Sequence, residues 1–306
     1  MRIKALIAIY LTHLKTRGRA YYTLRNARYT LRHFAGFLES ENAGDLDALN
    51  VALIREYQQE LCFCLTAKGR PLTLRTQALR LSIVKGFTRF LKARDYLVRD
   101  PAATIQLPKK PRRLPRLILS TAEVKRLLDA PDTRTGDGRR NRIVLELLYD
   151  TAIRRAEVAG IKLPDLDLAG GYIRITGKGD KDRVVPLSRR VAELVRTYIE
   201  GARPLFVKGE DPGYLILNRW GQRMNPNGIW AVVKRCAFLS GIEKNVTTHT
   251  FRHTCATHML KNGAPVRHLQ EMLGHESLES TQVYTHVTIN DLKQIHARFH
   301  PSETLE

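Results

Sequence analysis

Nine residues a third of the way along the chain most strongly limit how it can fold. Positions 108–116 read PKKPRRLPR, with three prolines and five basic side chains. Because proline lacks a backbone N–H and disfavours helix before it, this stretch predicts a stiff, extended linker. The 306 residues are enough for two domains with separate cores. We therefore predict a first domain over 1–107, a linker over 108–116 and a second domain over 117–306.

The first domain has the apolar spacing of a helical bundle. Apolar side chains recur at intervals of three and four over 20–40 and 71–94, and segments at 2–16 and 48–65 complete the expected bundle. Pro71 suits the first turn of the last helix. Basic side chains lie off the apolar faces; they include Arg25, Arg28 and Arg32 in the second helix, and Arg75, Arg80, Lys85 and Arg89 in the fourth.

The charge of the chain indicates a polyanionic partner. The net charge is +21, from 51 Lys and Arg against 30 Asp and Glu. Residues 1–107 carry 18 basic and 8 acidic side chains, a net of +10, and the rest carry 33 and 22, a net of +11. An excess spread over both domains is typical of a protein whose domains both contact nucleic acid.

The arginine faces and the linker supply the predicted contacts to DNA phosphates. A solvated charged face is the alternative for any one helix, but several such faces in one basic domain favour phosphate binding. The candidate DNA-binding residues are Arg25, Arg28, Arg32, Arg75, Lys109, Lys110, Arg112 and Arg113.

Composition also argues against a secreted or membrane protein. The four cysteines, Cys62, Cys64, Cys236 and Cys255, form no CxxC pair, and their spacing to histidines fits no common zinc pattern. The opening MRIKALIAIYLTHLK has an apolar stretch too short to span a bilayer and does not read as a signal peptide. We expect reduced thiols, a cytoplasmic, nucleoid-associated protein and no membrane partner.

The second domain mixes helices with a small antiparallel hairpin. Ser120 and Glu123 form a capping box before one helix, and a further helix is expected near 139–152. Residues 171–176 and 183–187 predict two strands joined by a turn rich in Gly, Lys and Asp. The predicted fold class is therefore mainly α with a small antiparallel β-hairpin or sheet in the second domain, an α+β arrangement.

Four local patterns in the second domain carry candidate chemistry. They are LLYDTAIRRAEV over 147–158, GKGDKDR over 177–183, HTFRH over 249–253, and LGH over 273–275 with Tyr284 nine residues beyond. Taken singly, each is weak: an Arg and Glu three apart usually form a surface pair, and the glycine-rich turn matches neither a P-loop nor a dinucleotide loop. Their order and spacing together are far more specific.

Together these patterns resemble the tyrosine recombinase, or phage integrase, family, most closely its Xer-like members. The resemblance covers about residues 120–300 with strong motifs, and residues 1–107 are more weakly similar to the family's helical DNA-clamping domain. One departure is Ala152-Ile153, where the family usually has Gly-Leu, which puts the local turn geometry in question. The resemblance implies a site-specific recombinase that cleaves and rejoins DNA strands through a 3′-phosphotyrosyl intermediate between the protein and the DNA.

Opening a phosphodiester with an alcohol requires charge stabilisation, a nucleophile and an acid. We assign Arg154 and Arg252 to the non-bridging oxygens, because guanidinium binds phosphate in a fork and stays protonated. His249 lies one helical turn from Arg252 and can bind the same phosphate or accept a proton. Glu157 is expected to support the site by holding Arg154 or a neighbour.

The remaining assignments complete the reaction. Lys178 is the predicted general acid, with Lys181 as the competing candidate, and His275 is the predicted donor to a phosphoryl oxygen. Tyr284 is the predicted nucleophile; its hydroxyl has an unperturbed pKa near 10, so it requires a cationic site to react as phenoxide. We expect no metal, cofactor or ATP, because the motifs lack the carboxylates that hold two Mg²⁺ ions and the tyrosyl link retains the bond energy.

Two related functions remain as alternatives: a type IB topoisomerase-like enzyme that nicks and reseals, and a DNA-binding protein without catalysis. The resemblance implies double-stranded DNA and a homotetrameric synapse as partners, with a second recombinase as a further candidate. Ile289, Leu292, Ile295 and Phe299 predict one apolar face of a C-terminal helix. From the sequence alone, this helix can equally pack on its own domain. The same resemblance implies that it docks on a neighbouring protomer instead. The DNA target, and whether the role is chromosome-dimer resolution, integration or inversion, are left open.

Overall fold

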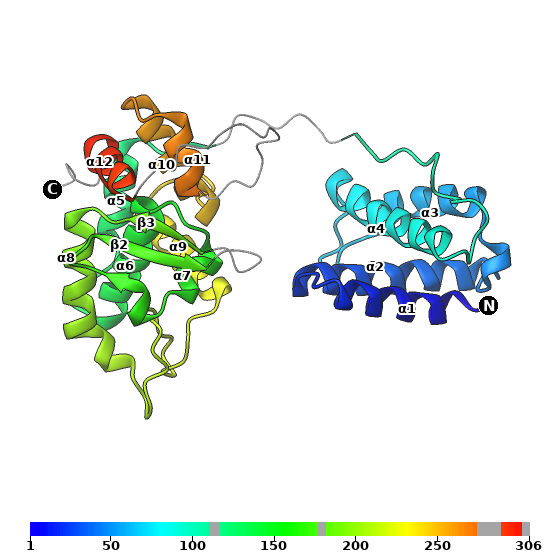
Figure 1. Ribbon diagram of the computed structural model, residues 1–306, viewed down its shortest axis with the longest axis horizontal. Helices are drawn as coiled ribbons and strands as arrows, with labels where there is room; N and C mark the ends of the chain where they lie inside the picture. Colours follow the sequence, from blue (N-terminus) through cyan, green and yellow to red (C-terminus); the bar gives the residue numbers. More distant parts are fainter. Residues whose placement is uncertain (110–116, 177–181, 274–288, 302–306) are drawn as a thin grey trace. The chain divides into compact units, whose positions relative to one another are not determined.

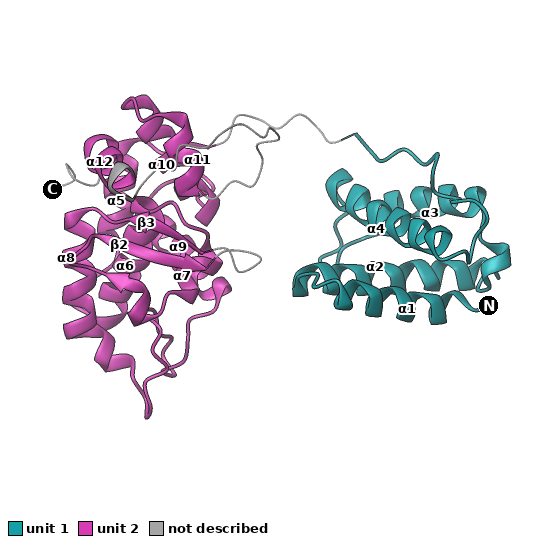
Figure 2. Ribbon diagram, in the orientation of Figure 1, with its two compact units in different colours: residues 1–113 teal, residues 114–306 magenta. Residues whose placement is uncertain are grey.

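The computed structural model describes residues 1–109, 117–176, 182–273 and 289–301. The chain divides into two compact units, residues 1–113 and 114–306, and each is described by itself (Figure 2). In both units the described segments are mostly helical, and the second contains a small antiparallel sheet (Figure 1). The predicted fold class is confirmed.

Unit 1 is a helical bundle built on the predicted apolar faces. Leu31 and Phe34 of the second helix and Leu81 and Phe87 of the fourth are completely buried. Burial of such side chains is the main source of stability in a small bundle, at roughly 1.5–3 kcal/mol each. The helices of unit 1 are α1 (Ile3–Thr16), α2 (Tyr21–Ser40), α3 (Val51–Phe63) and α4 (Leu74–Ala93), with a 3-10 turn η1 (Leu46–Ala48).

Two sequence-based expectations for unit 1 are wrong. Helix α4 begins at Leu74, because the Thr73 hydroxyl accepts the N–H of Thr76 and caps the helix, so Pro71 lies before the helix and not in its first turn. Arg80 lies inside the bundle, with 7% of its surface exposed and its guanidinium 5.2 Å from the ring centre of Tyr29. The charged group is covered by an aromatic face that periodicity alone does not reveal.

Unit 2 contains helices around one extended core. Its predicted Ser120–Glu123 capping box is confirmed, with both reciprocal hydrogen bonds formed.

No helix in the described parts of the chain is long and apolar enough to cross a membrane. The helices are α5 (Thr121–Asp129), α6 (Gly136–Asp150), α7 (Arg155–Gly160), η2 (Leu163–Asp165), α8 (Arg189–Thr197), η3 (Tyr198–Ala202), η4 (Arg203–Phe206), α9 (Pro226–Leu239), α10 (Thr248–Lys261), α11 (Val266–Leu273) and α12 (Ile289–Phe299).

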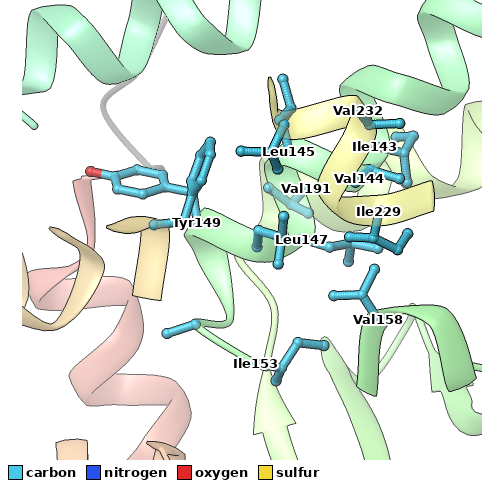
Figure 3. Close-up of a cluster of buried hydrophobic side chains, with 14 of the residues drawn as sticks. Ile143, Val144, Leu145, Leu147, Tyr149, Ile153, Val158, Val191, Ile229 and Val232 are labelled. Carbon is cyan, nitrogen blue, oxygen red and sulfur yellow. The ribbon is translucent and has the colours of Figure 1, made fainter. Parts of the chain in front are cut away.

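Helix α6 is the centre of this core. Every residue from Ile143 to Asp150 is buried, and Figure 3 shows Leu145 and Leu147 among side chains from α7, α8 and α9. A helix that is apolar all round requires packing on several sides. Two buried carboxylates are the exceptions. Glu146 forms ion pairs with Arg142 at 2.7 Å and Arg190 at 2.5 Å. Asp150 accepts the N–H of Ser188 at 2.9 Å. Helix α6 therefore supplies a rigid base for the turn that follows it.

The sheet consists of β1 (Leu166–Asp167), β2 (Tyr172–Thr176) and β3 (Asp182–Pro186) in antiparallel order. The β2–β3 register pairs Ile173 with Val185. Side chains alternate as expected for a half-buried strand, with Ile173 and Ile175 buried. The predicted pair of strands is confirmed, and β1 adds a short third strand.

Helix α12 packs on its own unit, which is the alternative to docking on a neighbouring protomer; the docking itself stays a prediction. It lies against β3, α10 and α11, and its Ile295 and Phe299 pack on the core of unit 2. The side chain of Ile289 lies outside the described residues. His296 is buried as well, and its Nε2 bonds the carbonyl of Asp150 at 2.8 Å. This polar anchor to the end of α6 favours packing in cis, and the apolar periodicity did not reveal it.

We predict that unit 2 loses stability below about pH 6.5. Burial lowers the pKa of His258, whose Nε2 donates to Leu119 O and whose Nδ1 accepts from the Tyr149 hydroxyl. The unfolded chain takes up a proton that folded His258 resists, so stability is present above this pH and is lost as pH falls. The loss between pH 7.5 and 5.5 is at most about 1.4 kcal/mol from this group.

Urea unfolding followed by fluorescence tests this prediction, because both tryptophans, Trp220 and Trp230, lie in unit 2. His258→Phe should lower stability at pH 7.5 yet reduce the loss between the two pH values. His13→Phe in unit 1 is the control and should leave that pH dependence unchanged. An identical pH dependence in His258→Phe and the unmodified chain would contradict the account.

Candidate active site

The turn between α6 and α7 presents the first predicted catalytic arginine. Ala152 has φ of +50°, in the left-handed region that favours glycine, and its side chain is completely buried. Arg154 comes two residues later, immediately before the first residue of α7. Its backbone N–H donates to Glu157 Oε2 at 2.7 Å. The chain thus keeps the sharp turn with alanine in place of the family's usual glycine.

Arg252, in the second turn of α10, joins this turn to another part of the site. Its Nη1 donates to the carbonyl of Ala152 at 2.8 Å, and its Nη2 donates to the carbonyl of Leu273. Leu273 is the last residue of α11. One guanidinium therefore holds the Arg154 turn and the end of α11 together.

The two arginines lie close enough for their charges to repel. Burial, and then the positive charge of Arg154, lower the pKa of Arg252 to about 10. Arg252 still carries its proton at neutral pH. Two guanidinium groups held together despite this repulsion form a site whose electrostatics favour an anion, and phosphate matches their fork geometry.

Glu157 lies beneath Arg154 and binds two arginines. Its Oε1 accepts from Arg154 Nη1 at 2.9 Å, and Arg183 donates to both carboxylate oxygens at 3.1 and 2.8 Å. Burial alone would raise the pKa of Glu157, but the hydrogen bonds from Arg183 and from the Arg154 backbone outweigh it, so the pKa is lowered. The carboxylate is therefore ionised at neutral pH.

His249 lies in the first turn of α10, three residues before Arg252. Residues three apart lie on the same side of a helix, and the positive end of the helix dipole favours an anion there. The His249 side chain is exposed. It is thus placed to contact a group bound at Arg252.

Several predicted catalytic residues lie outside the described residues. Lys178 and the competing Lys181 fall between the end of β2 at Thr176 and the start of β3 at Asp182. His275 and Tyr284 fall between α11, which ends at Leu273, and α12.

The candidate DNA-binding side chains of unit 1 are exposed. Arg25, Arg28 and Arg32 follow one another at intervals of three and four along α2, so they share one face. Arg25 stacks over the ring of Tyr22 at 5.0 Å. Arg75 in the first turn of α4 and Lys109 are exposed as well. Lys110, Arg112 and Arg113 lie outside the described residues.

Arg183 is the site residue that the sequence reasoning did not assign. It stands at the end of the GKGDKDR pattern, where it read as the first residue of a strand. Its side chain is only 16% exposed and pairs with Glu157, which is distant in sequence. A basic residue next to strand-forming valines was the one available signal, and only the folded chain identifies its partner.

Comparison with known proteins relates this arrangement to a family. Residues 118–291 match the model described as "Phage integrase family", and residues 7–95 match "Phage integrase, N-terminal SAM-like domain".

Among curated proteins, the chain is 35% identical to tyrosine recombinase XerD of Staphylococcus epidermidis, covering 98% of this chain and 99% of that protein. It is 39% identical to tyrosine recombinase XerC 2 of Ralstonia nicotianae, over 92% of this chain and 81% of the relative. A solved lambda integrase tetramer bound to a Holliday junction has a similar fold, with a TM-score of 0.70 at 16% identity, covering 94% of this chain and 81% of that one.

We predict that glycine is tolerated better at Ala152 than at another buried alanine. Ala159 is also buried, but it lies within α7. Both substitutions remove a buried methyl group, yet Ala152→Gly relieves a left-handed conformation that costs roughly 1–2 kcal/mol, whereas Ala159→Gly weakens a helix by about 1 kcal/mol. Ala152→Gly should therefore be at least about 1 kcal/mol less destabilising in urea unfolding. Equal losses would show that the turn is not strained.

Proposed function

The chain belongs to the phage integrase family of tyrosine recombinases, and we propose that it cuts and rejoins DNA through Tyr284 with Arg154 and Arg252 binding the cleaved phosphate. It is a site-specific DNA recombinase. The observation that carries the proposed roles is the pairing of two mutually repelling guanidinium groups, with the pKa of Arg252 lowered to about 10 by burial and by Arg154. The negative charge of a phosphodiester bound between these two groups would offset their repulsion.

The proposed reaction begins with the phosphate held by these arginines. Charge grows on the non-bridging oxygens as the fifth bond to phosphorus forms, and fixed cations stabilise that charge without reorganisation. His249, one turn before Arg252 on α10, binds the same phosphate or takes the nucleophile's proton. Because Arg252 is tied to two backbone carbonyls, its charge is preorganised before DNA arrives.

Tyr284 then attacks phosphorus, the bond to the 5′-oxygen breaks, and that oxygen takes a proton from Lys178, or from Lys181 if it is the acid. The products are a 3′-phosphotyrosyl link and a free 5′-hydroxyl. The link retains the phosphodiester energy, so the proposed strand exchange uses neither ATP nor a metal. His275 is proposed to donate to a phosphoryl oxygen.

Two of the other tyrosines in unit 2 are poorly suited to act as the nucleophile. Tyr198 is buried, and burial raises the pKa of its hydroxyl. Tyr172 hydrogen-bonds Asp167, which also raises its pKa. A raised pKa disfavours the phenoxide form, so neither tyrosine is a good nucleophile at neutral pH. In contrast, the segment that holds Tyr284 starts directly after Leu273, whose carbonyl Arg252 binds.

Unit 1 and the linker are proposed to bind the DNA backbone. The exposed row of Arg25, Arg28 and Arg32 on α2 presents three cations on one face, and Arg75 adds another on α4. Tyr22 beneath Arg25 orders its guanidinium by a cation–π contact. Together with Lys109, Lys110, Arg112 and Arg113, these residues would contact many phosphates of a duplex.

The working assembly is proposed to be a homotetramer on paired DNA sites, with a second recombinase as an alternative partner. The lambda integrase tetramer bound to a Holliday junction supports this arrangement at the level of fold. We place the reaction on DNA in the cytoplasm, at the nucleoid.

Tyr284→Phe tests the proposed function. The change removes only a hydroxyl, so folding and DNA affinity should be retained, while covalent protein–DNA adduct on a nicked substrate should fall below detection. Tyr172→Phe is the matched control and should form adduct normally. Adduct at the normal level in Tyr284→Phe would identify a different nucleophile and contradict the proposal.

A further inference from the structure

Arg183 lies in β3, immediately after the residues at 177–181, and its side chain is largely buried. Its Nη1 and Nη2 donate to Glu157 Oε1 and Oε2 at 3.1 and 2.8 Å. Two parallel bonds of this kind fix the planes of both groups. The Nε also reaches the carbonyl of Met272 in α11 at 3.4 Å, a longer and weaker contact.

The same carboxylate holds Arg154. Glu157 Oε2 accepts the Arg154 backbone N–H at 2.7 Å, and Oε1 accepts Arg154 Nη1 at 2.9 Å. Only 8% of the Glu157 side chain is exposed, so water competes little for these oxygens. The orientation of Glu157, set by Arg183, therefore determines where Arg154 points.

Arg183 also sets the charge balance beneath Arg154. Glu157 is ionised at neutral pH, since its pKa is lowered below the usual range despite its burial. One carboxylate between two guanidinium groups leaves a net charge of +1. Without Arg183, Glu157 would neutralise Arg154 alone and weaken its attraction for a phosphate.

We propose that Arg183 is a positioning residue for DNA cleavage, which holds and neutralises Glu157 so that Arg154 is aimed at the cleaved phosphate. This inference rests on the proposed function and assigns Arg183 no contact with DNA. Lysine cannot take its place, because one ammonium cannot form the two-bond fork on Glu157.

The test compares Arg183→Lys and Arg183→Gln with Arg174→Gln, a matched control in which an exposed arginine of β2 is changed. The readouts are the single-turnover rate of adduct formation and the affinity for one DNA site. Both Arg183 variants should form adduct about 10- to 100-fold more slowly, because small misplacements of catalytic groups carry losses of this order. Affinity should be unchanged, because many phosphate contacts supply it. Arg174→Gln should match the unmodified chain in both.

A second substrate separates the route through Arg154 from a route through the hairpin lysine. With sulfur at the 5′-bridging position, the leaving group requires no proton, so Lys178→Ala, or Lys181→Ala if that lysine is the acid, should recover cleavage. The Arg183 variants should remain slow on this substrate. Recovery by them would overturn the inference, because it would place the effect of Arg183 on the acid.

Arg183→Gln leaves a buried carboxylate half-paired and is expected to lose stability. The double variant Glu157→Gln with Arg183→Gln removes both charges and keeps the fold testable. If Arg183 acts through Glu157, the double variant should cleave no more slowly than the slower of the two single variants, Glu157→Gln and Arg183→Gln. Losses that multiply overturn the inference, as does a folded Arg183→Lys that cleaves normally. An unmodified chain that forms no adduct overturns the proposed function as well.

Discussion

The site depends on the position of Arg252 between two backbone carbonyls. By donating to Ala152 and Leu273, this side chain joins the turn after α6 to the end of α11. It is half buried beside Arg154, so its charge is poorly screened and the two guanidinium groups repel. Two cations that the fold holds together in this way favour an anion, and the proposed anion is the cleaved phosphate.

The rest of unit 2 maintains that arrangement. The second half of α6, from Ile143 to Asp150, is buried and fixes the start of the strained turn at Ala152. Strand β3 contributes Arg183, which supports Arg154 through Glu157, and α12 anchors to the end of α6 through His296. Elements from across unit 2 thus converge on one short turn.

The sequence predicted the elements better than their contacts. Apolar periodicity was sufficient for the helices of unit 1, and alternation was sufficient for β2 and β3, because burial on one face imposes those periods. Motif spacing also selected Arg154 and Arg252, whose catalytic roles stay predictions. The burial of Arg80, the pairing of Arg183 and the polar anchor of α12 were missed, since each depends on a partner distant in the chain: Tyr29, Glu157 and the end of α6. Periodicity describes one element at a time and carries no information about such pairs.

The central claim is that Arg154 and Arg252 together balance the negative charge of one phosphate. A DNA substrate in which a methyl group replaces one non-bridging oxygen of the cleaved phosphate tests this directly. Only the cleaved linkage is uncharged in this substrate, called the uncharged substrate below. On ordinary DNA, Arg252→Ala should cleave more slowly by on the order of 10²-fold or more. On the uncharged substrate, the deficit of Arg252→Ala relative to the unmodified chain should shrink at least about tenfold, because the charge to be balanced is gone. An equal deficit on both substrates would contradict the account.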